Sequence, residues 1–188
     1  MTTDDEAARA RLVAAADRLF YAHGIQSVGM DAVRAEAGVS LKRIYGLFPS
    51  KDDLVVAVLA HRTEIWNEGV TRAAAAEASP EGKLLSVFDF LSDWFREDDF
   101  RGCAFINSFG ELGARSPKVA SAIRAQKAAF RAHVLGLVRE HGATDDVAVQ
   151  IALLAEGAQT TAAILRDPTV AGQARSAAET LLAHAGAR

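Results

Sequence analysis

The stretch from Gly24 to Lys51 constrains the fold of this chain more than any other, because its pattern predicts two short helices around a tight turn. Met30, Val33 and Ala37 are spaced three and four apart, so they share one face of a helix. The run Gly38-Val39-Ser40 ends that helix. Glycine can adopt the left-handed conformation of a C-cap, and serine can cap the helix that follows.

The second of these helices has two different faces. Leu41, Ile44 and Phe48 are spaced for the inner face, and Pro49 ends the helix. The other face carries polar and small residues, namely Lys42, Arg43, Tyr45 and Gly46. Two helices around a short glycine-containing turn form the helix-turn-helix layout, in which the second helix enters the major groove of DNA.

Residues 11–59 resemble the N-terminal domain of TetR-family transcriptional regulators. The matching residues are Ala14-Ala15, Leu19-Phe20, Gly24, Ala37-Gly38-Val39-Ser40, Ile44-Tyr45, Phe48 and Ser50-Lys51. The resemblance implies an all-helical homodimer with a DNA-binding domain at 1–50 and a ligand-binding and dimerisation domain at 51–188. Gly29 departs from the family, which usually has serine or threonine as this helix N-cap, and glycine supplies no side-chain oxygen.

Composition restricts the class of protein. Of the 188 residues, 50% are hydrophobic and 24% are charged, which is typical of a soluble globular protein. The net charge is -3, so DNA binding depends on a local group of cations. The single cysteine excludes an internal disulfide. The polar, acidic N-terminus is unlike a signal peptide, and no apolar run approaches the ~20 residues of a membrane helix. We therefore expect a cytoplasmic protein that does not enter a membrane.

Helix starts are marked by a capping residue followed by proline at Ser79-Pro80, Ser116-Pro117 and Asp167-Pro168. Ser50 with Asp53 resembles a capping box, and Thr144 is expected to cap another helix. Besides the two short helices, these signals and the apolar periodicity predict helices at about 4–23, 51–77, 80–97, 103–113, 117–141, 144–166 and 168–185.

The DNA contacts are expected from the second short helix and from the start of the next one. Arg43 can form a bidentate bond with a guanine edge, and Lys42 can reach a base or a phosphate. The predicted contacts are Leu41, Lys42, Arg43, Tyr45, Gly46 and Lys51. The alternative is an ordinary solvated face. Residues 1–53 carry seven basic and eight acidic residues, so affinity is expected to depend on dimerisation and a few contacts.

A single short helix reads only a few base pairs, so we expect a two-fold dimer on a palindromic operator. The small residues of the last two helices favour close packing, and these helices are the expected dimer interface. Replacing Arg43 with alanine is expected to cost ~1–3 kcal/mol of binding free energy and to relax base preference.

The resemblance also implies a small, largely apolar effector. Candidate lining residues are aromatic and aliphatic side chains with a few polar groups: Trp66, Phe88, Leu91, Trp94, Phe95, Phe105, Asn107, Phe109, Phe130, His133 and Gln159. Glu111 is a further polar candidate. An ordinary core has the same composition, so for any one of these side chains a core role is the alternative.

Neither Cys103 nor the five histidines have the spacing of a metal site, and no cofactor is expected. The chain shows no nucleophile and base pair and no glycine-rich phosphate loop, which argues against an enzyme. We therefore predict a ligand-controlled, DNA-binding transcriptional regulator, most simply a repressor. The alternative is an interaction protein of the same fold that acts mainly through a protein partner.

Overall fold

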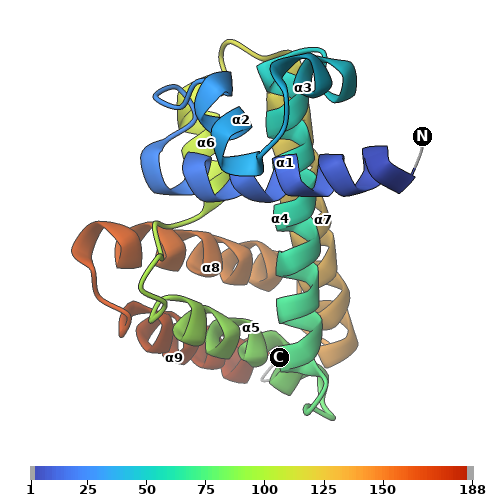
Figure 1. Ribbon diagram of the computed structural model, residues 1–188. Coiled ribbons are helices and arrows are strands. Elements are labelled where there is room, and N and C mark those ends of the chain that lie inside the picture. The colour runs from blue at the N-terminus through green and yellow to red at the C-terminus, as the bar shows by residue number, and fades with distance from the viewer. Residues whose placement is uncertain (1–2, 186–188) are drawn as a thin grey trace. The chain divides into compact units, whose positions relative to one another are not determined.

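A computed structural model describes residues 3–185 of the chain, and every regular element in that range is a helix (Figure 1). In chain order these are α1 (Thr3–His23), α2 (Met30–Ala37), α3 (Leu41–Leu47), α4 (Lys51–Ala74), α5 (Pro80–Trp94), α6 (Ala104–Leu112), α7 (Pro117–His141), α8 (Asp145–Leu165) and α9 (Val170–Ala185). The predicted all-α fold is confirmed, with most helix ends within three residues of expectation.

The helix ends follow from local chemistry, with two exceptions. Ser79 accepts a hydrogen bond from the Gly82 N–H at 3.0 Å, as its position before Pro80 predicts. The predicted cap at Thr144 is wrong in one respect, because its backbone is extended like a cap but its hydroxyl caps no N–H. Pro168 lies in a turn, stabilised by the Thr169 N–H bond to Asp167, and α9 begins only at Val170.

The chain packs as two compact units. The first contains residues 1–64 and 104–124, and the second contains residues 65–103 and 125–188. The first unit thus includes the helix-turn-helix segment, the start of α4, all of α6 and the start of α7. The boundary expected at residue 50 falls inside this unit, and as a division of function it stays a prediction.

In the first unit, α1 packs across α2 and α3 (Figure 1). The predicted three-helix core is present, since Val28, Val33, Ile44 and Phe48 are all buried. Leu12, Ala15 and Ala16 complete it from α1. This packing determines which face of α3 points away from the core.

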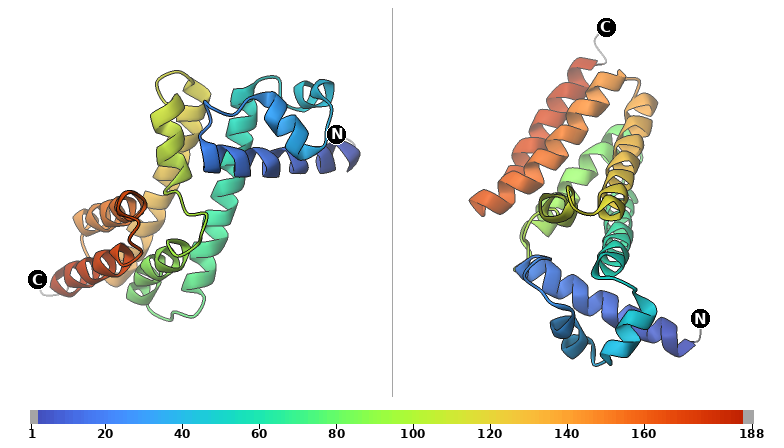
Figure 2. Two further views of the ribbon diagram at one scale, coloured as in Figure 1. Left: turned by 60° about the vertical axis from the view of Figure 1, so that its left-hand side comes forward. Right: turned by 90° about the horizontal axis from the view of Figure 1, so that it is seen from above.

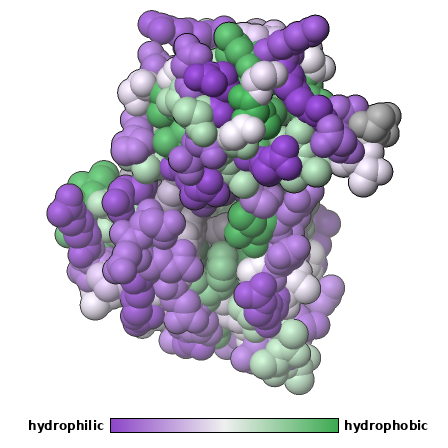
Figure 3. All heavy atoms as spheres, in the orientation of Figure 1, coloured by the Kyte–Doolittle hydropathy of each residue, from purple (hydrophilic) through white to green (hydrophobic). Residues whose placement is uncertain are grey.

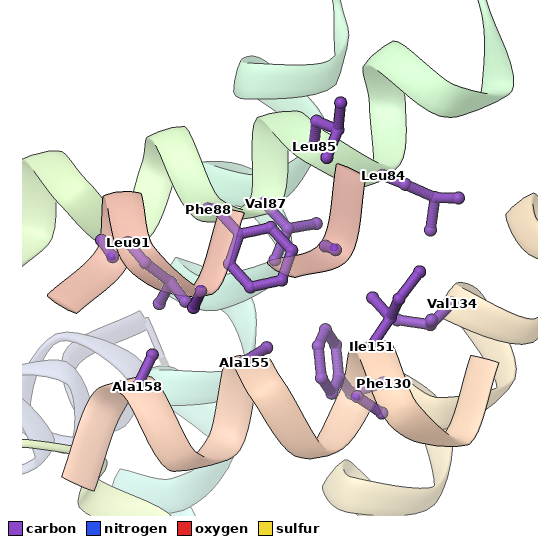
Figure 4. Close-up of a cluster of buried hydrophobic side chains, with 14 of the residues drawn as sticks. Leu84, Leu85, Val87, Phe88, Leu91, Phe130, Val134, Ile151, Ala155 and Ala158 are labelled. Atoms are coloured by element: carbon purple, nitrogen blue, oxygen red, sulfur yellow. The ribbon is translucent and has the colours of Figure 1, made fainter. Parts of the chain in front are cut away.

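The second unit is built on apolar packing. Helix α9 packs along both α8 and α5, and Figure 2 shows α8 and α9 side by side. Phe88 and Leu91 of α5, Phe130 of α7 and Ile151 of α8 point toward one another in its core (Figure 4). Alanines of α8, such as Ala155, are buried there as well and allow the close approach of neighbouring helices.

Helix α8 has the length and hydropathy of a membrane-spanning segment, but 44% of that segment is buried within the protein. Its buried side, which includes Ile151 and Ala155, packs in the core of the second unit. A core helix passes the same test of length and composition, so this feature is explained by the bundle.

Candidate nucleic-acid interface

The turn between α2 and α3 has the predicted geometry. Gly38 is left-handed, with φ 64°, and its N–H donates to the carbonyl oxygen of Ala35 at 3.3 Å. The Ser40 side chain then accepts a hydrogen bond from the Arg43 N–H at 3.2 Å. Both ends of the turn are therefore capped, which holds α3 at a defined angle to α2.

Packing leaves one face of α3 exposed. Ile44 is fully buried, whereas Lys42, Tyr45 and Gly46 are exposed. A Cβ at Gly46 would meet nothing within 4 Å, so the surface directly beside it is open. Leu41 was expected on the inner face of α3 and also among the DNA contacts. The first of these expectations is wrong, because Leu41 is 39% exposed. The exposed face thus offers a cation, a phenol and an apolar group.

Arg43, the expected base reader, is bound by acidic residues from the start of α1. Its Nη2 lies 2.6 Å from the Asp4 carboxylate and 3.0 Å from the Asp5 carboxylate. The Arg43 side chain is 34% exposed, and its Nε is buried without a hydrogen-bond partner among residues 3–185. The expected bidentate contact with guanine therefore requires this guanidinium to leave its present partners.

Lys51 differs from expectation in a similar way. Its ammonium donates to the carbonyl oxygens of Ile25 and Val28, the latter at 2.6 Å. It also lies 5.6 Å from the centre of the Phe20 ring. Burial lowers the pKa of Lys51, and the negative charges of Glu111 and Asp52 oppose this shift. The side chain predicted to meet a phosphate instead holds the loop between α1 and α2.

The same loop is held from another side by Glu111 of α6. The two carboxylate oxygens accept hydrogen bonds from the N–H groups of Ile25 and Gln26, at 3.0 and 2.7 Å. The Gln26 side-chain amide donates to the Glu111 carbonyl oxygen at 2.9 Å. Glu111, expected beside a ligand, therefore positions the loop that leads into α2. No local sequence pattern could have shown a contact across 86 positions.

Most other cations near α3 also contact the protein itself. Arg18 pairs with Glu36 at 2.8 Å, and Arg34 pairs with Asp31 at 3.5 Å. The Arg9 guanidinium lies over the Phe48 ring at 4.4 Å. Lys42 is exposed, and within residues 3–185 its ammonium has no carboxylate within ion-pair distance. Lys42 is thus the exposed cation that α3 presents in this conformation.

The predicted ligand residues are divided between the two units. In the second unit, Phe88, Leu91, Phe95, Phe130 and Gln159 are buried, and Trp66 and Trp94 are half-buried. Trp66 meets Phe130 edge to face at 5.4 Å, and the Gln159 amide donates to the Ala155 carbonyl oxygen at 3.1 Å. These contacts are those of a packed core. His133 is exposed and lies outside this packed core.

The remaining candidates, Phe105, Asn107 and Phe109, lie on α6 in the first unit. Phe105 is buried and Phe109 is 45% exposed. Asn107 lines a cavity of about 370 Å³ whose walls come from α1, α4 and α6. Its apolar walls include Phe20, Val58 and Leu59, and its polar groups include Asp17, Asn107 and Glu111.

Comparison with known proteins relates this geometry to a family. The family model of bacterial regulatory proteins of the tetR family matches residues 12–58, which contain the capped turn and α3. A crystal structure of SCO4454, a TetR-family transcriptional regulator from Streptomyces coelicolor, is 32% identical. The match covers 96% of this chain and 96% of that one, with a TM-score of 0.88. The chain belongs to the TetR family.

Two further relatives agree with this assignment. A structure of sav143, a putative TetR transcriptional regulator from Streptomyces avermitilis, is 31% identical over 95% of this chain and 98% of its own, with a TM-score of 0.83. The HTH-type transcriptional activator FasR of Mycolicibacterium smegmatis is 30% identical over 130 residues. That match covers 69% of this chain and 58% of FasR, so it spans little more than half of the relative's length.

As a TetR-family protein, the chain is a DNA-binding transcriptional regulator and not an enzyme. The predicted family, fold and class of function are thereby confirmed. Among residues 3–185, no group of three histidine, cysteine or acidic side chains is placed to hold a metal ion.

Proposed function

We propose that this TetR-family regulator binds a palindromic operator in the cytoplasm as a homodimer and represses transcription until a small, largely apolar ligand binds. The observation that carries the proposal is the exposed face of α3, with Lys42, Tyr45 and Gly46, presented by a turn that is capped on both sides. A helix of this length reads few base pairs, so a second copy is needed for specificity.

The proposed dimer is supported by α8. Val149, Leu153, Ile164 and Leu165 are large apolar residues of this helix that remain 41%, 66%, 75% and 63% exposed. The face of the molecule seen in Figure 3 is mostly hydrophilic, so side chains this apolar are better satisfied against a partner. Gly157 on the same helix leaves open space that allows a close approach of two copies.

The dimer is tested with Leu153→Glu. A buried carboxylate at the centre of the interface is expected to dissociate the dimer, and light scattering after size-exclusion chromatography measures the mass. Thr180→Glu, at an exposed position of α9, tests whether that helix also belongs to the interface, because dissociation of the dimer by this variant would extend the interface to α9. A monomeric wild-type protein would contradict the proposal.

The operator is tested by selecting bound sequences from a random DNA library with the full chain. A palindrome is the expected result. If Lys42 contacts a base, Lys42→Ala should then weaken operator binding by ~1–3 kcal/mol. If Lys42 contacts a phosphate, the affinity of this variant should depend less steeply on salt concentration. Arg11→Ala is a control, because Arg11 is an exposed cation of α1. If no DNA is selected, the interaction-protein alternative is favoured.

The direction of regulation is tested by transcription in vitro from a promoter that carries the selected operator. Repression that is relieved by ligand is expected. The relative FasR is named as an activator, so increased transcription is the specific outcome that would replace repression by activation.

The effector is proposed to bind in the second unit or in the α6-lined cavity of the first unit. The cavity, at about 370 Å³, lies within the size range of small-molecule sites. Gly110→Leu tests it, because Gly110 lines the cavity and a Cβ at this position meets nothing within 4 Å. Gly136→Leu on α7 is the matched control, since that position is equally open. Loss of ligand response in Gly110→Leu alone would locate the effector in this cavity.

A further inference from the structure

We propose that Asp4 and Asp5 compete with DNA for Arg43, so that the start of α1 sets how tightly and how selectively α3 reads the operator. This inference rests on the proposed operator binding and adds two specificity-determining residues to it. The Arg43 guanidinium lies against both carboxylates, with Nη2 at 2.6 Å from Asp4 and 3.0 Å from Asp5.

The donor geometry explains why these contacts prevent base reading. A bidentate bond to guanine O6 and N7 uses two nitrogens of one guanidinium, with parallel N–H bonds. In this structure Nη2 is directed at Asp4 and Asp5, and Nε is buried. Only Nη1 remains for an external acceptor, and one nitrogen cannot form the two-nitrogen fork. The clamped Arg43 therefore cannot make the strongest contact available to it.

Geometry and charge both indicate that the two carboxylates compete with DNA for Arg43 and do not position it for a base. A carboxylate that merely aligned an arginine for a base would leave two nitrogens directed outward, which is not the case here. Two carboxylates and one guanidinium also sum to a charge of -1 at the edge of a surface that must approach phosphates. Release of Arg43 from the two acids is therefore expected to favour DNA binding in two ways. Arg43 becomes available to a base, and the two carboxylates can move away from the phosphates.

The clamp is weak enough to open. Asp4 is 73% exposed and Asp5 is 35% exposed at the side chain, so water screens both ion pairs. An exposed ion pair changes an equilibrium by a factor of about 1.4 to 5. We count the two carboxylates on one guanidinium as a single ion pair in each copy. The factors of the two copies of a dimer then multiply, and we expect operator binding to tighten roughly 2- to 25-fold when both acids are neutralised.

Acidic residues at the start of a helix also stabilise the helix itself, so the control must separate this role from the contact with Arg43. Asp4, Asp5 and Glu6 all lie in the first turn of α1, where negative charge is favourable for the helix dipole. Glu6 is exposed and has no ion pair among residues 3–185. Glu6→Gln therefore changes the same helix turn by one unit of charge without releasing Arg43.

The test is a double-mutant cycle with the full chain and the DNA sequence selected by the wild-type protein. The variants are Asp4→Asn/Asp5→Asn and Glu6→Gln, each with Arg43 present and with Arg43→Ala. Dissociation constants are measured at one salt concentration for the operator and for a random duplex, and circular dichroism confirms that each variant is folded.

The expected result is tighter operator binding by Asp4→Asn/Asp5→Asn, a change below about twofold for Glu6→Gln, and loss of the gain when Arg43 is replaced. An equal gain with and without Arg43 would overturn the clamp and reduce it to general charge repulsion. Weaker binding would also overturn it, because the acids would then position Arg43 for DNA. If the wild-type protein binds no DNA, the proposed function fails first, and the clamp with it.

Discussion

Both units have an apolar core, and they differ in the polar contacts that accompany it. The second unit is packed on apolar side chains, with Phe88, Leu91 and Ile151 at or near zero exposure. In the first unit, polar contacts join segments far apart in the chain: Lys51 to Val28, Glu111 to Ile25, and Arg62 to Asp17 at 2.5 Å. Rearranging a close-packed apolar core loses contacts, whereas exposed hydrogen bonds and ion pairs can be exchanged for contacts with DNA or water. The second unit also has such pairs, Arg175 with Asp89 among them, and those of the first unit hold the loop that leads into α2.

The largest expected effect tests the apolar side of this comparison. Phe88→Ala should destabilise the second unit by about 3–5 kcal/mol, because Phe88 is 1% exposed and its removal leaves a cavity. Both tryptophans, Trp66 and Trp94, belong to this unit, so tryptophan fluorescence during urea unfolding reports on it. Ile65→Ala is the control at a 44% exposed position. Equal losses for the two variants would show that the core is loosely packed.

A smaller loss of stability is expected when a polar contact of the first unit is removed. Lys51→Met should destabilise the first unit by about 1–3 kcal/mol, because the Ile25 and Val28 carbonyl groups lose their donor. Amide hydrogen exchange should rise in residues 24–29 and stay unchanged in α8. Lys83→Met in the second unit is the control, since that ammonium forms no ion pair within residues 3–185. Exchange that rises equally in both units would contradict a local role.

Contacts between near neighbours in the chain could be predicted from the sequence. Helices, caps and the buried face of α3 depend on neighbours three or four positions apart, so periodicity and capping residues such as Ser79 and Gly38 were sufficient. The local rules failed at Thr144, whose hydroxyl makes no cap bond.

The polar contacts of the first unit lay beyond such rules. Arg43 and Asp5 are 38 positions apart, and nothing in the composition of α3 shows that its arginine is already paired. The residue types of the DNA-facing surface were therefore predictable, but the availability of each side chain was not. That availability depends on the packing of α1 against α3.

The smallest effect concerns acid. Asp53 accepts hydrogen bonds from Lys118 and Ser50, both at 2.6 Å, and these bonds, that of Lys118 first, lower the pKa of its carboxyl. A carboxylate with a lowered pKa in the folded state stabilises the protein above its unfolded pKa of about 3.9, and the contribution is lost as the pH falls from there. The first unit should therefore lose stability below about pH 4.

Lys118→Met removes the main cause of this shift, so its decline in stability with acid should be shallower than that of the wild-type protein. Unfolding monitored by circular dichroism between about pH 5 and pH 2.5 measures the difference. Arg124→Met removes a cation from the same helix and leaves the Asp53 contact in place. Parallel curves for Lys118→Met and the wild-type protein would mean that this exposed contact adds nothing. The polar contacts that matter for the first unit would then be those around residues 24–29.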